Sequence, residues 1–543
     1  MKKLIPIFLA YLSSFIVSNA QDLILTNGRI FTSDTAQLYV EALAVKDGRI
    51  TAIGKTADIE KLTTKSTQRI DLQGMLVVPG FNDAHNHLTG GFNFYRIALE
   101  GMNPTWQAVQ DSITKVVQKL PKGHWIEATI GPSIANSPET NRFVLDKIAP
   151  HHPVRLLSWW GHVGIFNTFA MKELDIAETQ PNPKGGFYER MPDGKTLTGK
   201  AFEKNAYHPH TALAKFDALR DDNAMIAELR GYTQALLRAG VTSYQNMCTY
   251  TSAEEYARIW KKAGLPFRLR LIRWGDVNTD GSLHIPSKNL PKYDKDLPLL
   301  TVSGTKWLLD GTPIEGGSEQ FDAHPNRPNW YGRANYTKAE IEKMCREAIA
   351  RHDQLHFHAV GDKTLSKLLD LLEEINIDWK TLRPRIEHGD GIDYKPEILE
   401  KARKLGVVIV QNPTHFAPME GIEAKTEPKG VAAFRSLLTQ AIPLAIGSDG
   451  PFNPYLNIMF AVTHPLRPSE AITREQAVIA YTRTSAYAEM DEQNKGTLTV
   501  GKVADLAVLS QNIFKVPLQR LVQTESILTM VNGKVVYNAG VLK

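Results

Sequence analysis

Cysteine is nearly absent from this chain, because only Cys248 and Cys345 occur among 543 residues. Two cysteines so far apart cannot provide the disulfide framework that holds small secreted domains together. The chain must therefore fold around a hydrophobic core. We expect both cysteines to pack in that core as small apolar side chains.

Several other features are missing, and each absence excludes a class of protein. Beyond residue 20 no apolar stretch suits a membrane-spanning helix, which needs roughly 20 residues, so stable membrane insertion is not expected. There is no repeat of the kind that builds solenoids. The net charge is +5, but Lys and Arg are scattered, so no nucleic-acid partner is expected. The composition, 43% hydrophobic and 22% charged, is that of an ordinary globular protein.

The first twenty residues differ from the rest. Lys2 and Lys3 precede an apolar stretch at residues 4–17, and small residues follow at 18–20. This pattern is typical of a secretory signal peptide, with Gln21 as the first residue of the mature chain. The alternative is an uncleaved anchor, but the apolar stretch is short for a membrane span. We expect an exported protein, periplasmic in a Gram-negative cell.

The two ends of the mature chain carry the same kind of pattern. Asn27-Gly28, Asp47-Gly48 and Asn532-Gly533 each lie between two short apolar runs, which is a hairpin signal. The ends therefore predict one β-sandwich domain, split in sequence between residues 21–74 and 496–543.

The middle of the chain alternates between strand and helix patterns. Such alternation predicts a parallel α/β sheet, and eight strands predict a closed (β/α)8 TIM barrel. We assign residues 75–93 to the first strand and its surroundings and residues 226–495 to the rest. The eight expected strands lie at residues 75–79, 241–244, 267–272, 305–309, 354–358, 384–388, 407–410 and 443–447.

The gap after the first strand is too long for an ordinary connection. Connections in such folds are usually short, so residues 94–225 are expected to form an inserted subdomain. It contains strand-like runs at 124–129 and 154–160 and a Gly/Pro-rich loop at 181–199. An insertion after a barrel strand emerges at the catalytic face, where it can cover a site.

Polar residues stand at the ends of several expected strands. His85 and His87 form an H-x-H pair, and alternate strand residues point to the same side. Neutral imidazole is a common metal ligand. Each such residue alone has a structural explanation, but together they meet on one face of one barrel. The remaining candidates are Lys306, His358, His388 and Asp449.

With these residues in order, the chain resembles the amidohydrolase superfamily, and more narrowly amidohydrolase family 3, the branch with N-substituted formamide deformylases. The order is H-x-H on strand one, Lys on four, His on five and six, and Asp on eight. The resemblance covers nearly the whole mature chain. The motifs that carry it are P-G-F-N-D-A-H-N-H, G-T-K-W-L-L-D-G, H-A-V-G-D, R-I-E-H, Q-N-P-T-H, G-S-D-G-P and G-T-L-T-V-G-K-V-A-D-L-A-V-L.

The resemblance implies two divalent metal ions, with zinc expected. One metal would be held by His85, His87 and Asp449, and the other by His358 and His388. Lys306, carboxylated on its side-chain nitrogen, would bridge them. A metal-bridging hydroxide would attack the scissile carbonyl of a non-peptide C–N bond in an amide, formamide or cyclic imide. Asp449 would be the proton shuttle.

Further residues match the family pattern less closely. His162 and His415 are predicted as catalytic residues that hold the substrate carbonyl, with the alternative that both are structural. Glu203, Trp160 and His356 are predicted as pocket residues, although His356 could instead support the ligands from behind. The chain departs from the family at 245–246, where Gln and Asn stand in place of an acid.

Other functions remain open at this stage. The same hydroxide could attack a lactone or ester. Deaminases of the superfamily mostly lack the strand-four lysine, so Lys306 argues against deamination. A non-catalytic periplasmic binding protein is the non-enzymatic alternative, and retention of all six ligand candidates argues against it. The resemblance implies a small-molecule substrate, and a homodimer stays an open alternative.

Overall fold

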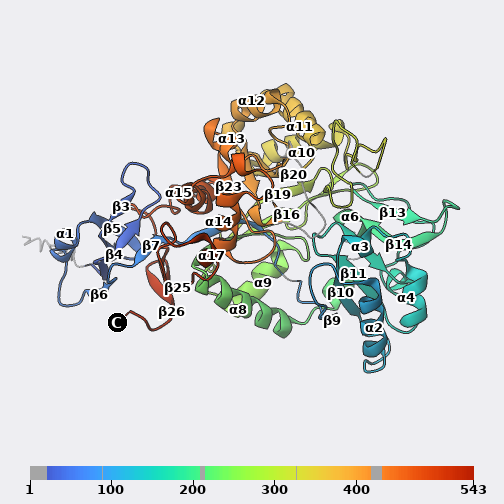
Figure 1. Ribbon diagram of the computed structural model, residues 1–543, viewed down its shortest axis with the longest axis horizontal. Helices are drawn as coiled ribbons and strands as arrows, with labels where there is room; N and C mark the ends of the chain where they lie inside the picture. Colours follow the sequence, from blue (N-terminus) through green and yellow to red (C-terminus); the bar gives the residue numbers. More distant parts are fainter. Residues whose placement is uncertain (1–20, 89, 208–214, 326, 417–430, 543) are drawn as a thin grey trace, which may run out of the picture.

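The computed structural model describes residues 21–88, 90–207, 215–325, 327–416 and 431–542. Figure 1 shows three parts: a β-domain at one end, a barrel in the centre and an inserted subdomain at the other end. The C-terminus lies beside the β-domain, close to strands from the start of the chain.

The central barrel has eight strands, and every neighbouring pair is parallel. The last and first strands meet where the Asp449 N–H donates to the His85 carbonyl oxygen at 2.8 Å. The expected TIM barrel is therefore confirmed. Its strands, in sheet order, are β8 (Phe81–Asn86), β15 (Val241–Met247), β16 (Arg268–Trp274), β19 (Leu300–Leu308), β20 (Leu355–Ala359), β21 (Arg385–His388), β22 (Val408–Gln411) and β23 (Leu444–Ile446).

Amphipathic helices cover the barrel. In α11 (Asp362–Ile375), Leu365, Leu368, Leu369 and Leu372 recur at helical spacing and are all buried. The connection after β16 instead forms a small hairpin, β17 (Asp276–Val277) and β18 (Leu283–His284). The other helices of this layer are α8 (Asp222–Arg238), α9 (Ala253–Ala263), α10 (Lys338–Arg351), α12 (Pro396–Leu405), α13 (Phe434–Thr439) and α14 (Pro454–Thr463).

The β-domain combines both ends of the chain in two sheets. One sheet has the order β5 (Arg49–Gly54), β4 (Ala42–Lys46), β1 (Leu23–Thr26), β6 (Gln68–Asp71). The other has the order β26 (Lys534–Asn538), β25 (Ser526–Val531), β24 (Leu506–Leu509), β7 (Leu76–Pro79), β2 (Arg29–Phe31), β3 (Tyr39–Val40). Leu25 and Leu43 from the first sheet share a core with Val77 and Leu506 from the second. The domain is thus a sandwich split in sequence.

One strand assignment was wrong. Residues 75–79 were expected to be the first barrel strand, but β7 pairs with β2 and β24 in the sandwich. The first barrel strand is β8, directly after Gly80. A Cβ at Gly80 would lie 2.1 Å from Thr242 Oγ1, so only glycine fits where the chain passes from sandwich to barrel.

The inserted subdomain forms a mixed six-stranded sheet. Its order is β13 (Phe187–Arg190), β14 (Leu197–Phe202), β12 (Val163–Phe166), β11 (Val154–Ser158), β10 (Ile126–Ile130), β9 (Tyr95–Ile97). The expected loop at 181–199 instead contains β13 and the start of β14, which pair as a hairpin. The helices of this part are α2 (Trp106–Val117), α3 (Pro132–Ala135), α4 (Arg142–Ile148), α5 (Thr168–Glu173) and α6 (Lys204–Tyr207).

Cys248 and Cys345 are both free and buried, as expected. Among the described residues, no helix has the length and apolar character required to cross a bilayer. Residues 1–20, to which the signal peptide was assigned, lie outside the described residues.

Candidate metal centre

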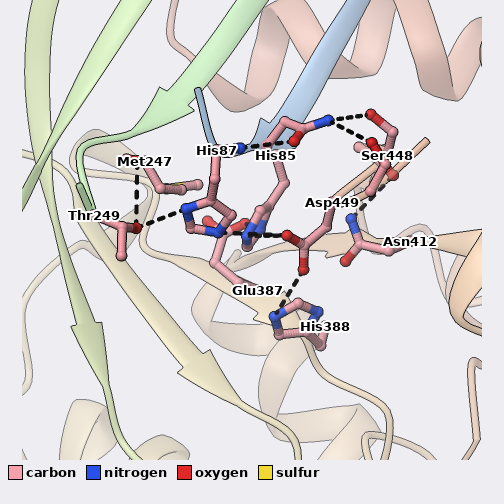
Figure 2. A network of polar contacts seen from close by, with 12 residues as sticks. His85, His87, Met247, Thr249, Glu387, His388, Asn412, Ser448 and Asp449 are labelled. Atoms are coloured by element: carbon pink, nitrogen blue, oxygen red, sulfur yellow. Dashed lines mark hydrogen bonds and ion pairs between the residues drawn. The ribbon is translucent and has the colours of Figure 1, made fainter. Parts of the chain in front are cut away.

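His85 and His87 project from the end of β8 and are held from behind. The Nδ1 atom of His85 lies 2.7 Å from Glu387 Oε2, and that of His87 lies 2.6 Å from Thr249 Oγ1. Since the Glu387 carboxylate is an acceptor, His85 donates through Nδ1 and keeps the Nε2 lone pair free. In Figure 2 both rings face Asp449.

Asp449 lies between two pairs of imidazoles. Its Oδ1 is 3.8 Å from His85 Nε2 and 3.4 Å from His87 Nε2. Its Oδ2 is 4.0 Å from His388 Nε2 and 3.6 Å from His415 Nε2. Distances above hydrogen-bond length leave room for an ion between the carboxylate and each pair.

His358 and His388 complete the ring of imidazoles. Their ring centroids are 4.6 Å apart, and His388 lies 5.0 Å from His85. The Nε2 atom of His358 is buried and has no hydrogen-bond partner within the described part of the chain. A buried polar atom without a partner is costly, and a metal ion would satisfy it.

Lys306 lies on β19, in register with Trp274 of β16 on one side and His356 of β20 on the other. Its side chain is buried, and burial lowers its pKa to about 8. The Lys306 charge in turn lowers the pKa of His85 and His358, so its amine lies among the imidazoles. The bridging role of Lys306 stays a prediction.

The residues present fit a metal centre. Burial lowers the pKa of His87, His358 and His388 well below the ordinary value, so each imidazole is neutral and can act as a ligand. The ligand atoms of His85, His87 and Asp449 all lie within 4.8 Å of one another, and so do those of His388, His415 and Asp449.

A buried charged layer supports the ligands from below. Glu387 accepts from His85 and, at 3.0 Å, from His356 Nδ1, and it is paired with Arg385. His356 is fully buried in this layer and is not a pocket residue. Gln245 stands where members of the family often carry an acid, and its side-chain oxygen accepts a hydrogen bond from Arg385.

Glu387 was not recognised from the sequence as part of the site. Strand alternation places Glu387 and His388 on opposite faces. His388, however, has a left-handed φ of 70°, which turns its ring back over the barrel. One feature of the sequence could have indicated Glu387. Arg385 and Glu387 are two charged residues two positions apart on one strand, so both side chains point to the barrel interior.

A second polar cluster joins the inserted subdomain to the barrel. His162 Nδ1 lies 2.8 Å from Glu203 Oε2, and the His162 ring centroid is 5.0 Å from that of His358. Burial opposes protonation of His162, but the charge and hydrogen bond of Glu203 outweigh it and raise the His162 pKa. Trp160 Nε1 donates to Glu315 Oε2 at 2.8 Å in the same cluster.

The cluster gives the predicted pocket residues of the insertion distinct positions. His162 lies beside the ligand candidate His358, Glu203 bonds to the His162 Nδ1 atom, and Trp160 donates to Glu315. Glu315 was not recognised from the sequence, because it lies in the loop after β19 with no distinguishing pattern. Its carboxylate is held by the hydroxyl and N–H groups of Thr312.

Comparison with known proteins gives matches over almost the whole chain. The model of the amidohydrolase family matches residues 68–537. Protein LONG AFTER FAR-RED 3 of Arabidopsis thaliana is 28% identical over 550 residues, covering 95% of this chain and 91% of that protein. The N-substituted formamide deformylase of Arthrobacter pascens is 26% identical over 555 residues, covering 96% of this chain and 99% of that protein.

A solved structure supports the fold. An uncharacterised metal-dependent hydrolase from Pyrococcus horikoshii OT3 superposes with a TM-score of 0.69 at 19% identity. The match covers 92% of this chain and 99% of that one, so barrel, sandwich and insertion are all included.

Proposed function

Because the chain belongs to the amidohydrolase family and is thus a metal-dependent hydrolase of carbon–nitrogen bonds other than peptide bonds, we propose that it cleaves an amide, formamide or cyclic imide. The observation that carries the proposal is the position of Asp449, with one carboxylate oxygen toward His85 and His87 and the other toward His388. The deformylase named above acts, by its name, on N-substituted formamides, which is one such class.

The proposed cofactor is a pair of divalent metal ions, with zinc preferred by the imidazole-rich ligands. His85, His87 and Asp449 would hold one ion, and His358 and His388 the other. When bound, the metals supply a water of lowered pKa and a Lewis acid for the carbonyl.

Lys306 is proposed to carry a carboxylate on its side-chain nitrogen. The neutral amine adds to carbon dioxide and releases one proton, which leaves a carbamate anion with two oxygen donors. Burial favours the reactive neutral amine, because it lowers the Lys306 pKa to about 8. An ammonium at this position could not bind a cation, whereas the carbamate can bridge two.

Asp449 is proposed to move the proton that the reaction requires. It would take a proton from the attacking water and transfer it to the leaving nitrogen, so that one water and one amide give an acid and an amine. His162, whose pKa is raised, would donate to the substrate carbonyl oxygen. His415, beside His388 and Asp449, would hold the same oxygen from the other side.

Ester or lactone hydrolysis is the second candidate, because the same groups would attack either carbonyl. Deamination is less favoured, since Lys306 lies among the ligand imidazoles and would serve a bridged pair of metals. The binding-protein alternative does not agree with membership of a hydrolase family.

The test is turnover of matched N-formyl, N-acetyl, cyclic-imide and lactone compounds by the metal-loaded enzyme and by Asp449→Asn. We expect hydrolysis of a C–N substrate, and a fall in kcat of about 100-fold to 10,000-fold in the variant. Asp322→Asn, which removes a surface carboxylate bonded to Tyr394, is the control and should retain full turnover. Equal turnover by Asp449→Asn would contradict the assigned role, and turnover of lactones alone would contradict the assigned bond.

A further inference from the structure

Lys204 is a buried lysine at the edge of the metal centre. It begins α6, directly after β14, at the junction of the inserted subdomain and the barrel (Figure 1). Its side chain is only 7% exposed. The preceding residue, Glu203, has a left-handed φ of 63°, so the two consecutive side chains diverge. Glu203 turns toward His162, and Lys204 turns toward the barrel.

Two aromatic rings locate the Lys204 amine. Its Nζ lies 5.2 Å from the ring centroid of Trp274 and 6.0 Å from that of Tyr250. Trp274 is the last residue of β16, and Tyr250 follows β15. These two strands lie between the one that carries His85 and the one that carries Lys306. The amine therefore lies above the ends of β15 and β16, the two described barrel strands between His85 and Lys306, and neither strand supplies a ligand candidate.

The same position is reflected in the electrostatics of the centre. After burial, the Lys204 charge is the strongest influence that lowers the pKa of His87, and it also lowers that of Lys306. The amine thus lies near the ligand candidates His87 and Lys306, in agreement with its contacts with Trp274 and Tyr250.

The Lys204 amine makes no hydrogen bond and no ion pair within the described residues, and it lies over the rings of Trp274 and Tyr250. Glu203, its nearest acid in sequence, is already bonded to His162. Burial lowers the Lys204 pKa to about 8, although the charges of Asp449 and Glu203 oppose this shift without forming an ion pair with the amine. The charges of two bound divalent cations would outweigh those of Asp449 and a carboxylated Lys306. With metals bound, the Lys204 ammonium would therefore still lack a compensating negative charge.

Buried lysines are ordinarily paired, because an isolated ammonium loses its hydration without compensation. Lys200, four residues earlier, shows the ordinary arrangement: it is 2% exposed and donates to the Ser137 carbonyl oxygen. The difference between these two lysines indicates that the partner of Lys204 comes from outside the described residues, and a bound substrate is the partner that its place beside the metal centre favours.

We propose that Lys204 is the specificity residue for a carboxylate on the substrate, so that the enzyme acts on amides that carry a negative charge. The carboxylate would accept hydrogen bonds from the ammonium, with the Trp274 and Tyr250 rings beside it. This inference rests on the proposed function, since it names the class of amide that enters the same site.

The test compares two matched pairs of amides with zinc-loaded enzyme. The first pair is N-acetylphenylalanine and N-acetylphenethylamine, with the charge on the amine side. The second is succinic acid monobenzylamide and N-benzylpropanamide, with the charge on the acyl side. We expect the wild type to prefer the carboxylate in one pair. In Lys204→Met, the kcat/KM ratio between the members of that pair should fall by about 100-fold.

Lys200→Met is the matched control, because it makes the same change at a buried lysine of the same subdomain that is directed elsewhere. The ratio should not change in that variant, and metal content should be equal in all three proteins. A ratio unchanged by Lys204→Met, or a preference for the uncharged member of both pairs, would overturn the proposal.

A binding measurement separates this inference from the proposed function. If the enzyme cleaves neither pair, calorimetric binding of phenylacetate and acetohydroxamate decides the matter. Phenylacetate carries the anionic group and a ring, whereas acetohydroxamate binds metals without reaching Lys204. Lys204→Met should weaken phenylacetate binding by about 30-fold and leave acetohydroxamate binding unchanged. If the wild type and Lys204→Met bound phenylacetate with equal affinity, the proposed role of Lys204 in binding the substrate carboxylate would be refuted.

Discussion

Three residues of the centre have left-handed backbone conformations. Glu203, His388 and Asp449 have φ values of 63°, 70° and 40°. A non-glycine residue in this region costs on the order of 1–3 kcal/mol, so the surrounding contacts must hold it there. At each position the unusual backbone directs a functional side chain to a place that regular strand alternation would not reach.

The buried carboxylate of Glu387 gives the first prediction. His85 and His356 each donate a hydrogen bond through Nδ1 to a Glu387 oxygen. Glu387→Gln replaces one of these oxygens by an NH2 donor, so one of the two imidazoles loses its acceptor. We expect metal affinity to fall by about 10-fold to 100-fold, because the ligand imidazole loses its orienting partner. Competition with a chromophoric chelator measures this. Glu373→Gln, which changes an exposed glutamate paired with Lys404, should bind metal normally. Wild-type affinity in Glu387→Gln would contradict the supporting role.

The pH profile gives the second prediction. Glu203 raises the His162 pKa, so its protonated form persists to higher pH than an isolated imidazole in this place. Glu203→Gln removes that charge and lowers the His162 pKa. The alkaline fall of kcat/KM should therefore begin at lower pH in the variant. Glu173→Gln, on the exposed side of the insertion, should retain the wild-type profile. An unshifted profile in Glu203→Gln would show that the His162 proton is not used.

At the scale of single elements, sequence pattern predicted most barrel strands correctly. The helices between them follow the same physical rule, since the leucines of α11 recur at helical spacing on the face that packs in the core. The first barrel strand was missed because β7 and β8 follow each other across a single residue, Gly80. The apolar run looked like a barrel strand, but only pairing partners distinguish it from a sandwich strand.

Helix capping gives a prediction at this scale. The Thr337 side chain accepts the Glu340 N–H at the start of α10, and Glu340 bonds back in a capping box. Thr337→Ala should lower the free energy of unfolding by about 1 kcal/mol and leave turnover unchanged. Lys55→Ala alters the N-cap residue of α1 (Thr56–Glu60), where no side-chain cap hydrogen bond is made, and should leave stability unchanged. Urea unfolding measures both, and equal stability of Thr337→Ala and the wild type would contradict the cap.

At the scale of the whole molecule, the paired hairpin signals predicted that the two chain ends form one domain, because sheet strands need partners wherever they lie in sequence. The ligand order predicted the site, since carboxyl ends of parallel strands meet at one barrel face. Pattern could not predict Glu315 or the orientation of Lys204. Both depend on how the insertion packs on the barrel, and that packing is set by contacts far apart in sequence.

Export remains a prediction of the N-terminal sequence. Expressed in a Gram-negative host, the full chain should appear in the periplasmic fraction with Gln21 at its N-terminus. Edman sequencing of that fraction measures this. Replacement of Lys2 and Lys3 by Glu should retain the precursor in the cytoplasm. A full-length chain starting at Met1 in the soluble periplasmic fraction would contradict cleavage.

The central claim is that hydrolysis depends on metals held by the imidazoles around Asp449. The most direct measurement is metal content by mass spectrometry together with amide turnover, as a chelator removes the metals and zinc is added back. We predict that turnover is lost with the metals and returns with zinc, reaching its full value at about two ions per chain. Full turnover by the metal-free protein would contradict the account.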